Sequence, residues 1–312
     1  MLSALLLAGA AAPISLRVPV NETTDTARYT PGVLSPDTIS HIAPFFKGMP
    51  VDPYLKQGTR TRLYGKYRLA RLNAEAPRLA EYMTNVFIQT GAYNDLVKRG
   101  EVALVRKYER LPHGFMETVA AQTIIDQCAD DMLAMGAPPD TPFEFSMHAI
   151  RVSAPGNPTP EGTHQDGYAS VCSAVIGRTG VDGGHSRVHT GKYDDSVLDL
   201  PMMPGDLLVV NDQLVYHSVS NLTVLPGHHS GFRDVLVITA RPWRGGRMGE
   251  DDGAVGLLQL EGITEAPNPT GATVEEGDDY LASGEGTLHG ANVSSGSSLI
   301  TRLRTQRKLL WL

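Results

Sequence analysis

Two histidines and one aspartate have the types and spacing of a metal site. His164 and Asp166 are separated by one residue, and His217 lies later in a short apolar segment. In a strand, alternate residues share a face, so the imidazole of His164 and the carboxylate of Asp166 would point the same way. Two histidines and a carboxylate form the facial triad of non-haem Fe(II) centres, which leaves coordination positions open. These three residues are the candidate metal ligands and the candidate catalytic centre.

The triplet alone is a weak signal, because the chain has 10 histidines and 34 acidic residues. An exposed loop for His164 and a hydrogen-bonded strand histidine for His217 remain alternatives. The order of elements favours the metal site: the triplet, then one or two hairpins, a Pro204-Gly205-Asp206 turn, a strand, and His217. A double-stranded β-helix brings its ligands to one mouth in this order.

The surrounding pattern predicts an α+β protein. Short β-rich runs separated by Gly and Pro are typical of a sandwich or barrel, and they cover 143–152, 168–176, 186–189, 207–211, 215–219 and 235–240. Apolar spacing of three and four residues predicts helices over 69–97 and 116–135, whereas 16–55 looks mostly irregular. We expect a double-stranded β-helix core (jelly-roll, cupin-like) with an N-terminal helical layer.

One arginine extends the hypothesis from metal to cosubstrate. A 2-oxoacid chelated to iron leaves its far carboxylate in need of a cation, and the planar guanidinium pairs with both oxygens. Arg233 opens the strand that follows His217 and is the first candidate. Arg241 and Arg187 are rival positions, and a simple ion pair between Arg233 and Asp234 is the alternative explanation.

Composition restricts the partners. The net charge is −7 with scattered basic residues, which argues against a nucleic-acid partner. The apolar segment Met1 to Pro13 is too short to span a bilayer, so no membrane partner is expected. It suits a cleaved targeting segment and a disordered terminus equally well. Two distant cysteines, Cys128 and Cys172, make neither a disulfide framework nor a structural zinc site. We expect a cytoplasmic protein, with its oligomeric state open.

Three segments follow from these patterns. Residues 1–15 form the targeting segment or disordered terminus, and residues 16–245 form the catalytic domain with its N-terminal helices. Residues 246–312 are rich in Gly, Glu, Asp, Ser and Thr, which predicts a largely disordered tail.

Four stretches resemble a known family, the 2-oxoglutarate/Fe(II)-dependent dioxygenases that hydroxylate free amino acids, the group containing L-isoleucine 4-hydroxylase. The stretches are His164-Gln165-Asp166-Gly167, Gly183-Gly184-His185-Ser186-Arg187, Val215-Tyr216-His217 and the run of residues 231–239. Asp52-Pro53-Tyr54, followed by Arg60, Arg62 and Tyr67, is also similar to the N-terminal region of that group. The resemblance covers about residues 45–243.

The resemblance implies a role for each candidate residue. His164, Asp166 and His217 would bind Fe(II), and Arg233 would bind the distal carboxylate of 2-oxoglutarate. With O2, the enzyme would hydroxylate a free L-amino acid or similar small metabolite and release succinate and CO2. Two alternatives remain: a cupin-type metal enzyme that does not use 2-oxoglutarate, and a non-catalytic β-sandwich that binds a small molecule.

Overall fold

A computed structural model describes residues 12–16, 25–55, 58–78, 80–90 and 103–243. The tail 246–312 and most of the N-terminal segment 1–15 therefore lie outside the described residues. Within these ranges no helix combines the length and the apolar character needed to cross a membrane.

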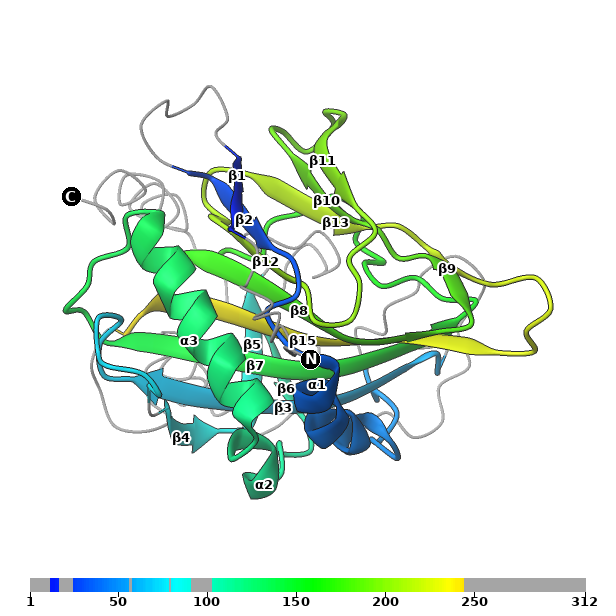
Figure 1. The fold of residues 1–312 in the computed structure, drawn as a ribbon, viewed down its shortest axis with the longest axis horizontal. Helices are drawn as coiled ribbons and strands as arrows, with labels where there is room; N and C mark the ends of the chain where they lie inside the picture. Colours follow the sequence, from blue (N-terminus) through cyan, green and yellow to red (C-terminus); the bar gives the residue numbers. More distant parts are fainter. Residues whose placement is uncertain (1–11, 17–24, 56–57, 79, 91–102, 244–312) are drawn as a thin grey trace, which may run out of the picture.

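A large antiparallel sheet dominates the molecule (Figure 1). Its strand order is β1-β2-β12-β8-β15-β7-β3-β4. The bounds are β1 Ile14–Leu16, β2 Ala27–Thr30, β12 Leu207–Val210, β8 Ser170–Thr179, β15 Gly231–Pro242, β7 Phe143–Ala154, β3 Arg60–Leu69 and β4 Ala80–Thr84.

Three smaller sheets complete the strand inventory of the described residues. The first has the order β11-β10-β13, and the others are the pairs β14-β9 and β5-β6. Their bounds are β11 Ser196–Leu200, β10 Ser186–His189, β13 Tyr216–Val219, β14 Leu222–Val224, β9 Val181–Gly183, β5 Val86–Thr90 and β6 Ala103–Lys107. This mainly β architecture is consistent with the expected double-stranded β-helix.

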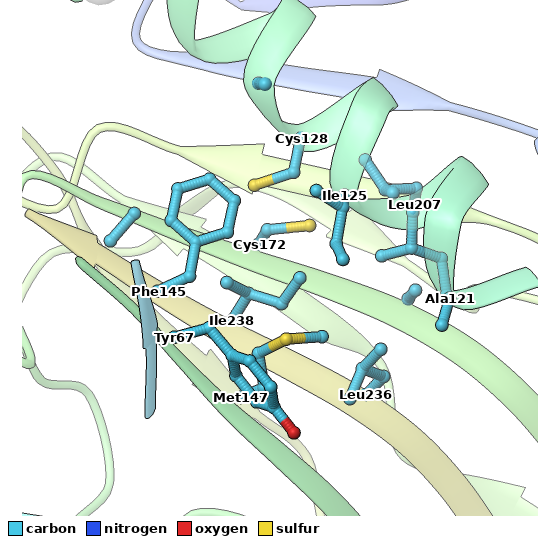
Figure 2. Close-up of a cluster of buried hydrophobic side chains, with 14 of the residues drawn as sticks. Tyr67, Ala121, Ile125, Cys128, Phe145, Met147, Cys172, Leu207, Leu236 and Ile238 are labelled. Atoms are coloured by element: carbon cyan, nitrogen blue, oxygen red, sulfur yellow. The ribbon is translucent and has the colours of Figure 1, made fainter. Parts of the chain in front are cut away.

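One face of the large sheet is apolar and packs against α3, Val119–Ala134 (Figure 1). Figure 2 shows Ile125 of α3 beside Phe145 and above Ile238 and Met147 of the sheet. The helix begins at Thr118, whose hydroxyl accepts a hydrogen bond from Ala121 N at 3.1 Å. This core is where burial of apolar surface stabilises the fold.

The opposite face of the large sheet faces the protein interior. Because side chains alternate along a strand, the residues between the apolar ones on β7 include Ser146 and His148. Farther along the sheet, Val175 of β8 and Leu208 of β12 share a second core with Val188 of β10. The large sheet and the β11-β10-β13 sheet thus enclose one interior.

The helix expected over 116–135 is confirmed as α3, but the helix expected over 69–97 is wrong. That range contains β4 and β5 instead. Tyr82 of β4 pairs with Tyr67 of β3, and Pro77 lacks the N–H that a helix interior needs. Strand pairing across the sheet therefore outweighed the local helical spacing.

The expected N-terminal helical layer is reduced to short elements in the described residues. They are α1 Pro36–Ile42, the 3₁₀ helix η1 Ala43–Phe46 and α2 His113–Met116. The region expected to be mostly irregular thus contains α1, because Pro36 occupies the first helical turn and Ser35 caps it. Proline in that position starts a helix and does not break it.

Replacing Ile125 with alanine tests the core between α3 and the sheet. Ile125 is completely buried, so Ile125→Ala should lower the free energy of unfolding by about 2–5 kcal/mol. Val119 lies on the same helix but is 68 % exposed, so Val119→Ala should change it by less than about 0.5 kcal/mol. Urea unfolding of both variants measures the difference, and equal losses would contradict this packing.

Candidate metal centre

His164 and His217 come together through their backbones. They form an isolated antiparallel bridge, in which His164 N donates to His217 O at 3.0 Å and His217 N donates to His164 O at 2.9 Å. His217 belongs to β13, which pairs with β10 so that Val188 lies opposite it. The two imidazole centroids are 4.4 Å apart. The bridge therefore carries both rings to one place.

Asp166 completes the cluster. Its Oδ1 lies 3.7 Å from His164 Nε2 and its Oδ2 lies 3.5 Å from His217 Nε2. One donor atom from each of the three residues lies within 4.8 Å of the others. Donors bonded to one metal at about 2.1 Å lie about 3 Å apart, so these residues fit a single ion. All three sequence-predicted ligands are thus brought together.

The tautomer of His164 suits this role. Its Nδ1 lies 2.9 Å from the carbonyl oxygen of Gly162, which makes Nδ1–H the donor and leaves Nε2 as the lone-pair nitrogen facing the cluster. A second carboxylate oxygen, Glu161 Oε1, lies 3.4 Å from the same Nε2.

The electrostatics of the cluster favour a bound cation. Burial alone would lower the pKa of His217, but the carboxylates of Asp166 and Asp212 outweigh it and raise this pKa to about 10. Burial would raise the pKa of Asp166, yet His217, His164 and the charge of Arg62 lower it to about 2. Asp166 is therefore a carboxylate at neutral pH, the form that binds a metal.

Asp212 supports the centre from behind and was not identified from the sequence. Its carboxylate accepts hydrogen bonds from the backbone N–H groups of Asp166, Gly167 and Tyr168 at 3.2, 2.7 and 3.1 Å. Its Oδ1 also lies 3.3 Å from His217 Nδ1. That contact falls short of hydrogen-bond geometry, so it is mainly electrostatic. One carboxylate thereby touches both ligand-bearing segments.

Arg233 is buried on β15 without a carboxylate partner among the described residues. Its Nη2 donates to Ser186 Oγ at 3.3 Å, and its buried Nε has no hydrogen-bond partner there. Arg178 of β8 lies directly opposite in the strand register. Burial, together with the charge of Arg178, lowers the pKa of Arg233 to about 10, which still leaves it cationic at neutral pH.

Two adjacent cations, here the buried Arg233 and the half-buried Arg178, repel each other unless an anion joins them. Arg178 Nη2 donates to Gly183 O at 2.7 Å, and its Nη1 is buried without a hydrogen-bond partner in the described residues. Arg178 was also not identified from the sequence, because its relation to Arg233 depends on the pairing of β8 with β15. Unsatisfied donors on two guanidinium groups fit a carboxylate ligand.

The rival arginines are already paired. Arg241 Nη2 lies 3.1 Å from Glu144 Oε2, and Arg187 Nε donates to Asp199 Oδ2 at 2.8 Å on the surface. The expected alternative, an ion pair between Arg233 and Asp234, is not formed. Asp234 accepts two hydrogen bonds from Arg151, at 2.7 and 2.8 Å.

Tyr168, which follows the triplet, is buried in an aromatic cluster with Tyr64, Phe87 and Tyr108. Two other histidines of this region pair elsewhere. His185 Nδ1 lies 2.6 Å from Asp199 Oδ1, and His189 Nε2 lies 2.9 Å from Ser218 Oγ.

Comparison with known proteins agrees with this geometry. Residues 43–239 match the family described as 2OG-Fe dioxygenase. A bsmA homolog from Methylobium petroleophilum PM1 is 26 % identical with a TM-score of 0.56, over 66 % of this chain and 81 % of the homolog.

IDO from Bacillus thuringiensis is 16 % identical with a TM-score of 0.56, over 70 % of this chain and 95 % of that one, a likeness of fold. A search of curated protein sequences gave no significant match. The family match spans most of the chain and contains the His-Asp-His cluster. This protein therefore belongs to the 2OG-Fe dioxygenase family, oxidoreductases that use Fe(II), 2-oxoglutarate and O2.

Proposed function

We propose that this enzyme hydroxylates a free L-amino acid or a similar small metabolite and releases succinate and CO2. The observation that carries the proposal is the convergence of His164, Asp166 and His217 in the same interior as Arg233, a cation with no carboxylate partner among the described residues. The choice of an amino acid is supported by the four sequence stretches that resemble free amino-acid hydroxylases.

Each residue has a stated task in this proposal. His164, Asp166 and His217 would hold Fe(II), which would supply the site for the oxidising chemistry. Arg233 and Arg178 hold the distal carboxylate of 2-oxoglutarate. The bound iron and cosubstrate supply the oxidising chemistry with O2, while the protein orients the target carbon and excludes water.

The two alternatives have less support. A cupin-type metal enzyme without 2-oxoglutarate leaves the buried, unpaired Arg233 without a purpose, although a buried cation without a partner is costly. A non-catalytic binding protein conflicts with membership in an oxidoreductase family.

Asp212 is the positioning residue of this site in our proposal. A carboxylate behind a ligand histidine fixes the orientation of the ring and raises its basicity. Here the same carboxylate also holds the backbone after Asp166 through three N–H groups. Loss of the Asp212 contacts would therefore displace both Asp166 and His217.

Substituting His217 tests the metal centre. We expect anaerobic addition of Fe(II) and then 2-oxoglutarate to the wild-type protein to give the visible charge-transfer band of a chelated 2-oxoacid. His217→Ala should give neither this band nor turnover, because two ligands seldom hold iron in catalytic geometry. His185→Ala is the matched control, since His185 pairs with Asp199. Activity retained by His217→Ala after metal stripping and iron reloading would refute the assignment.

Substituting Arg233 separates cosubstrate binding from stability. Removal of one partner of a buried charge pair costs roughly 2–5 kcal/mol of binding, so Arg233→Ala should need at least about 30-fold more 2-oxoglutarate to form the band. The free energy of unfolding without ligand should not fall, because an unpaired buried cation is removed. The control is Arg187→Ala, which removes an exposed arginine paired with Asp199. An unchanged 2-oxoglutarate requirement would contradict the role of Arg233.

Substituting Asp212 tests the support behind the ligands. Asp212→Asn keeps one carbonyl acceptor but loses the charge, so Fe(II) affinity should fall about 10- to 100-fold. Direct metal titration measures this without reference to turnover. Asp199→Asn is the control, because Asp199 is an aspartate beside a histidine on the surface. Equal Fe(II) affinities in the two variants would show that Asp212 does not position the ligands.

A further inference from the structure

A second buried cationic group lies on the interior face of the large sheet, on β3. Arg62, Tyr64 and Lys66 alternate along β3 and therefore share this face. His148 and Ser146 face the same side from the paired strand β7, in register with Tyr64 and Lys66. These residues are neither metal ligands nor contacts of Arg233.

The hydrogen bonds of the Arg62 side chain go to two neutral groups. Its Nη1 donates to the hydroxyl of Tyr108 at 3.2 Å, and its Nη2 lies 2.5 Å from His148 Nδ1. Its guanidinium also lies over the Tyr108 ring, 4.5 Å from the centroid. Burial, with nearby cations including Arg62, lowers the pKa of His148 well below its ordinary value, so His148 is the neutral acceptor of this bond.

The donors of Arg62 are not used up by these contacts. A guanidinium has five N–H donors in a planar fork, and the hydrogen bonds to Tyr108 and His148 occupy two. The buried Nε has no hydrogen-bond partner in the described part of the chain. The carboxylate of Asp52 forms long ion pairs with Arg60 Nε at 3.6 Å and with Arg62 Nη1 at 3.7 Å, and neither distance allows a hydrogen bond. Arg62 is therefore a positioned, buried cation with spare donors.

Arg62 is also close to the metal centre. Its charge is one of those that lower the pKa of the Asp166 carboxyl. Tyr108, on which the guanidinium stacks, belongs to the same aromatic cluster as Tyr168, two residues after Asp166. A molecule bound at Arg62 would thus lie within reach of the iron ligands.

The region beside Arg62 on this face is aliphatic. Ile150 of β7 pairs with both Arg62 of β3 and Val235 of β15. Ile150, Val152 and Val235 are buried in one apolar cluster. A ligand with one anionic end and a short aliphatic body therefore matches the surface between β3 and β15.

We propose that Arg62 binds the carboxylate of the substrate, which makes the substrate a small aliphatic carboxylic acid with its target carbon near the iron. Tyr108 and His148 hold the guanidinium so that Nε and an adjacent Nη face the carboxylate in a bidentate pair. This inference rests on the proposed function, because it places the substrate beside the iron and 2-oxoglutarate site. The two carboxylates present, that of the substrate and that of the cosubstrate, then have separate arginines, Arg62 and Arg233.

The test compares free acids with their neutral amides. Iron-loaded protein with 2-oxoglutarate is titrated anaerobically with the 20 common L-amino acids, short aliphatic carboxylic acids, and the primary carboxamide of each. Perturbation of the visible band reports binding, and succinate release in air reports use. In the wild-type protein, acids should bind at least about 10-fold more tightly than their amides, since a charge-assisted hydrogen bond contributes about 1.5–3 kcal/mol.

Arg62→Gln should still form the band with 2-oxoglutarate but lose the preference for acids, with an acid-to-amide affinity ratio near one. Arg62→Lys keeps the charge without the fork and should recover part of the preference. If Arg62→Gln does not fold, the acid-to-amide affinity ratio of Arg62→Lys tests the proposal instead. A ratio equal to that of the wild-type protein would then overturn it. Arg187→Gln is the control on the surface.

The outcomes separate the two proposals. No band in the wild-type protein would refute the proposed function and this inference with it. A normal band with equal binding of acids and amides, or with no response to any acid, would overturn the role of Arg62 and leave the oxygenase intact. Unchanged acid preference in Arg62→Gln would do the same.

Discussion

The backbone bridge between His164 and His217 is the interaction on which the metal centre depends. Two hydrogen bonds of 3.0 and 2.9 Å join segments that are distant in the chain, and the rings follow the backbones. Asp212 then fastens the segment after Asp166 with three N–H contacts. Hydrogen bonds of the backbone thus set most of the ligand geometry. Side chains that moved freely could not hold the three ligands in place.

The two faces of the large sheet have different roles, one in stabilising the fold and the other in forming the site. On β7, Phe145 and Met147 pack against the α3 side, whereas Ser146 and His148 look into the interior. The interior face contains cations such as Arg233 whose burial is unfavourable without an anion. Burial of the apolar core under α3 offsets this cost in the free energy of folding. A bound carboxylate would pair with the cation and remove the cost, which would favour binding.

Local sequence patterns predicted the elements whose apolar residues face a single core. Helix α3 and the strands after Pro142 belong to this class. The strand expected over His164 and Asp166 is wrong, because His164 forms only an isolated bridge to His217 and Asp166 lies outside the strands. The helix over 69–97 failed because Tyr82 pairs with Tyr67 across the sheet. A spacing of three and four residues does not reveal such a partner, and Pro77 was the local sign against a helix.

The sequence by itself determined the residue types of the centre, the order of the ligands along the chain and the strand that carries Arg233. Only the tertiary structure favours Arg233 over its rivals, since the pairing of Arg241 with Glu144 depends on strand register. It alone placed Asp212 behind the ligands, Arg178 opposite Arg233, and Arg62 beside the centre. The physical reason is that these contacts join residues far apart in the chain, and the pairing of β3, β7, β15 and β8 determines which of them meet.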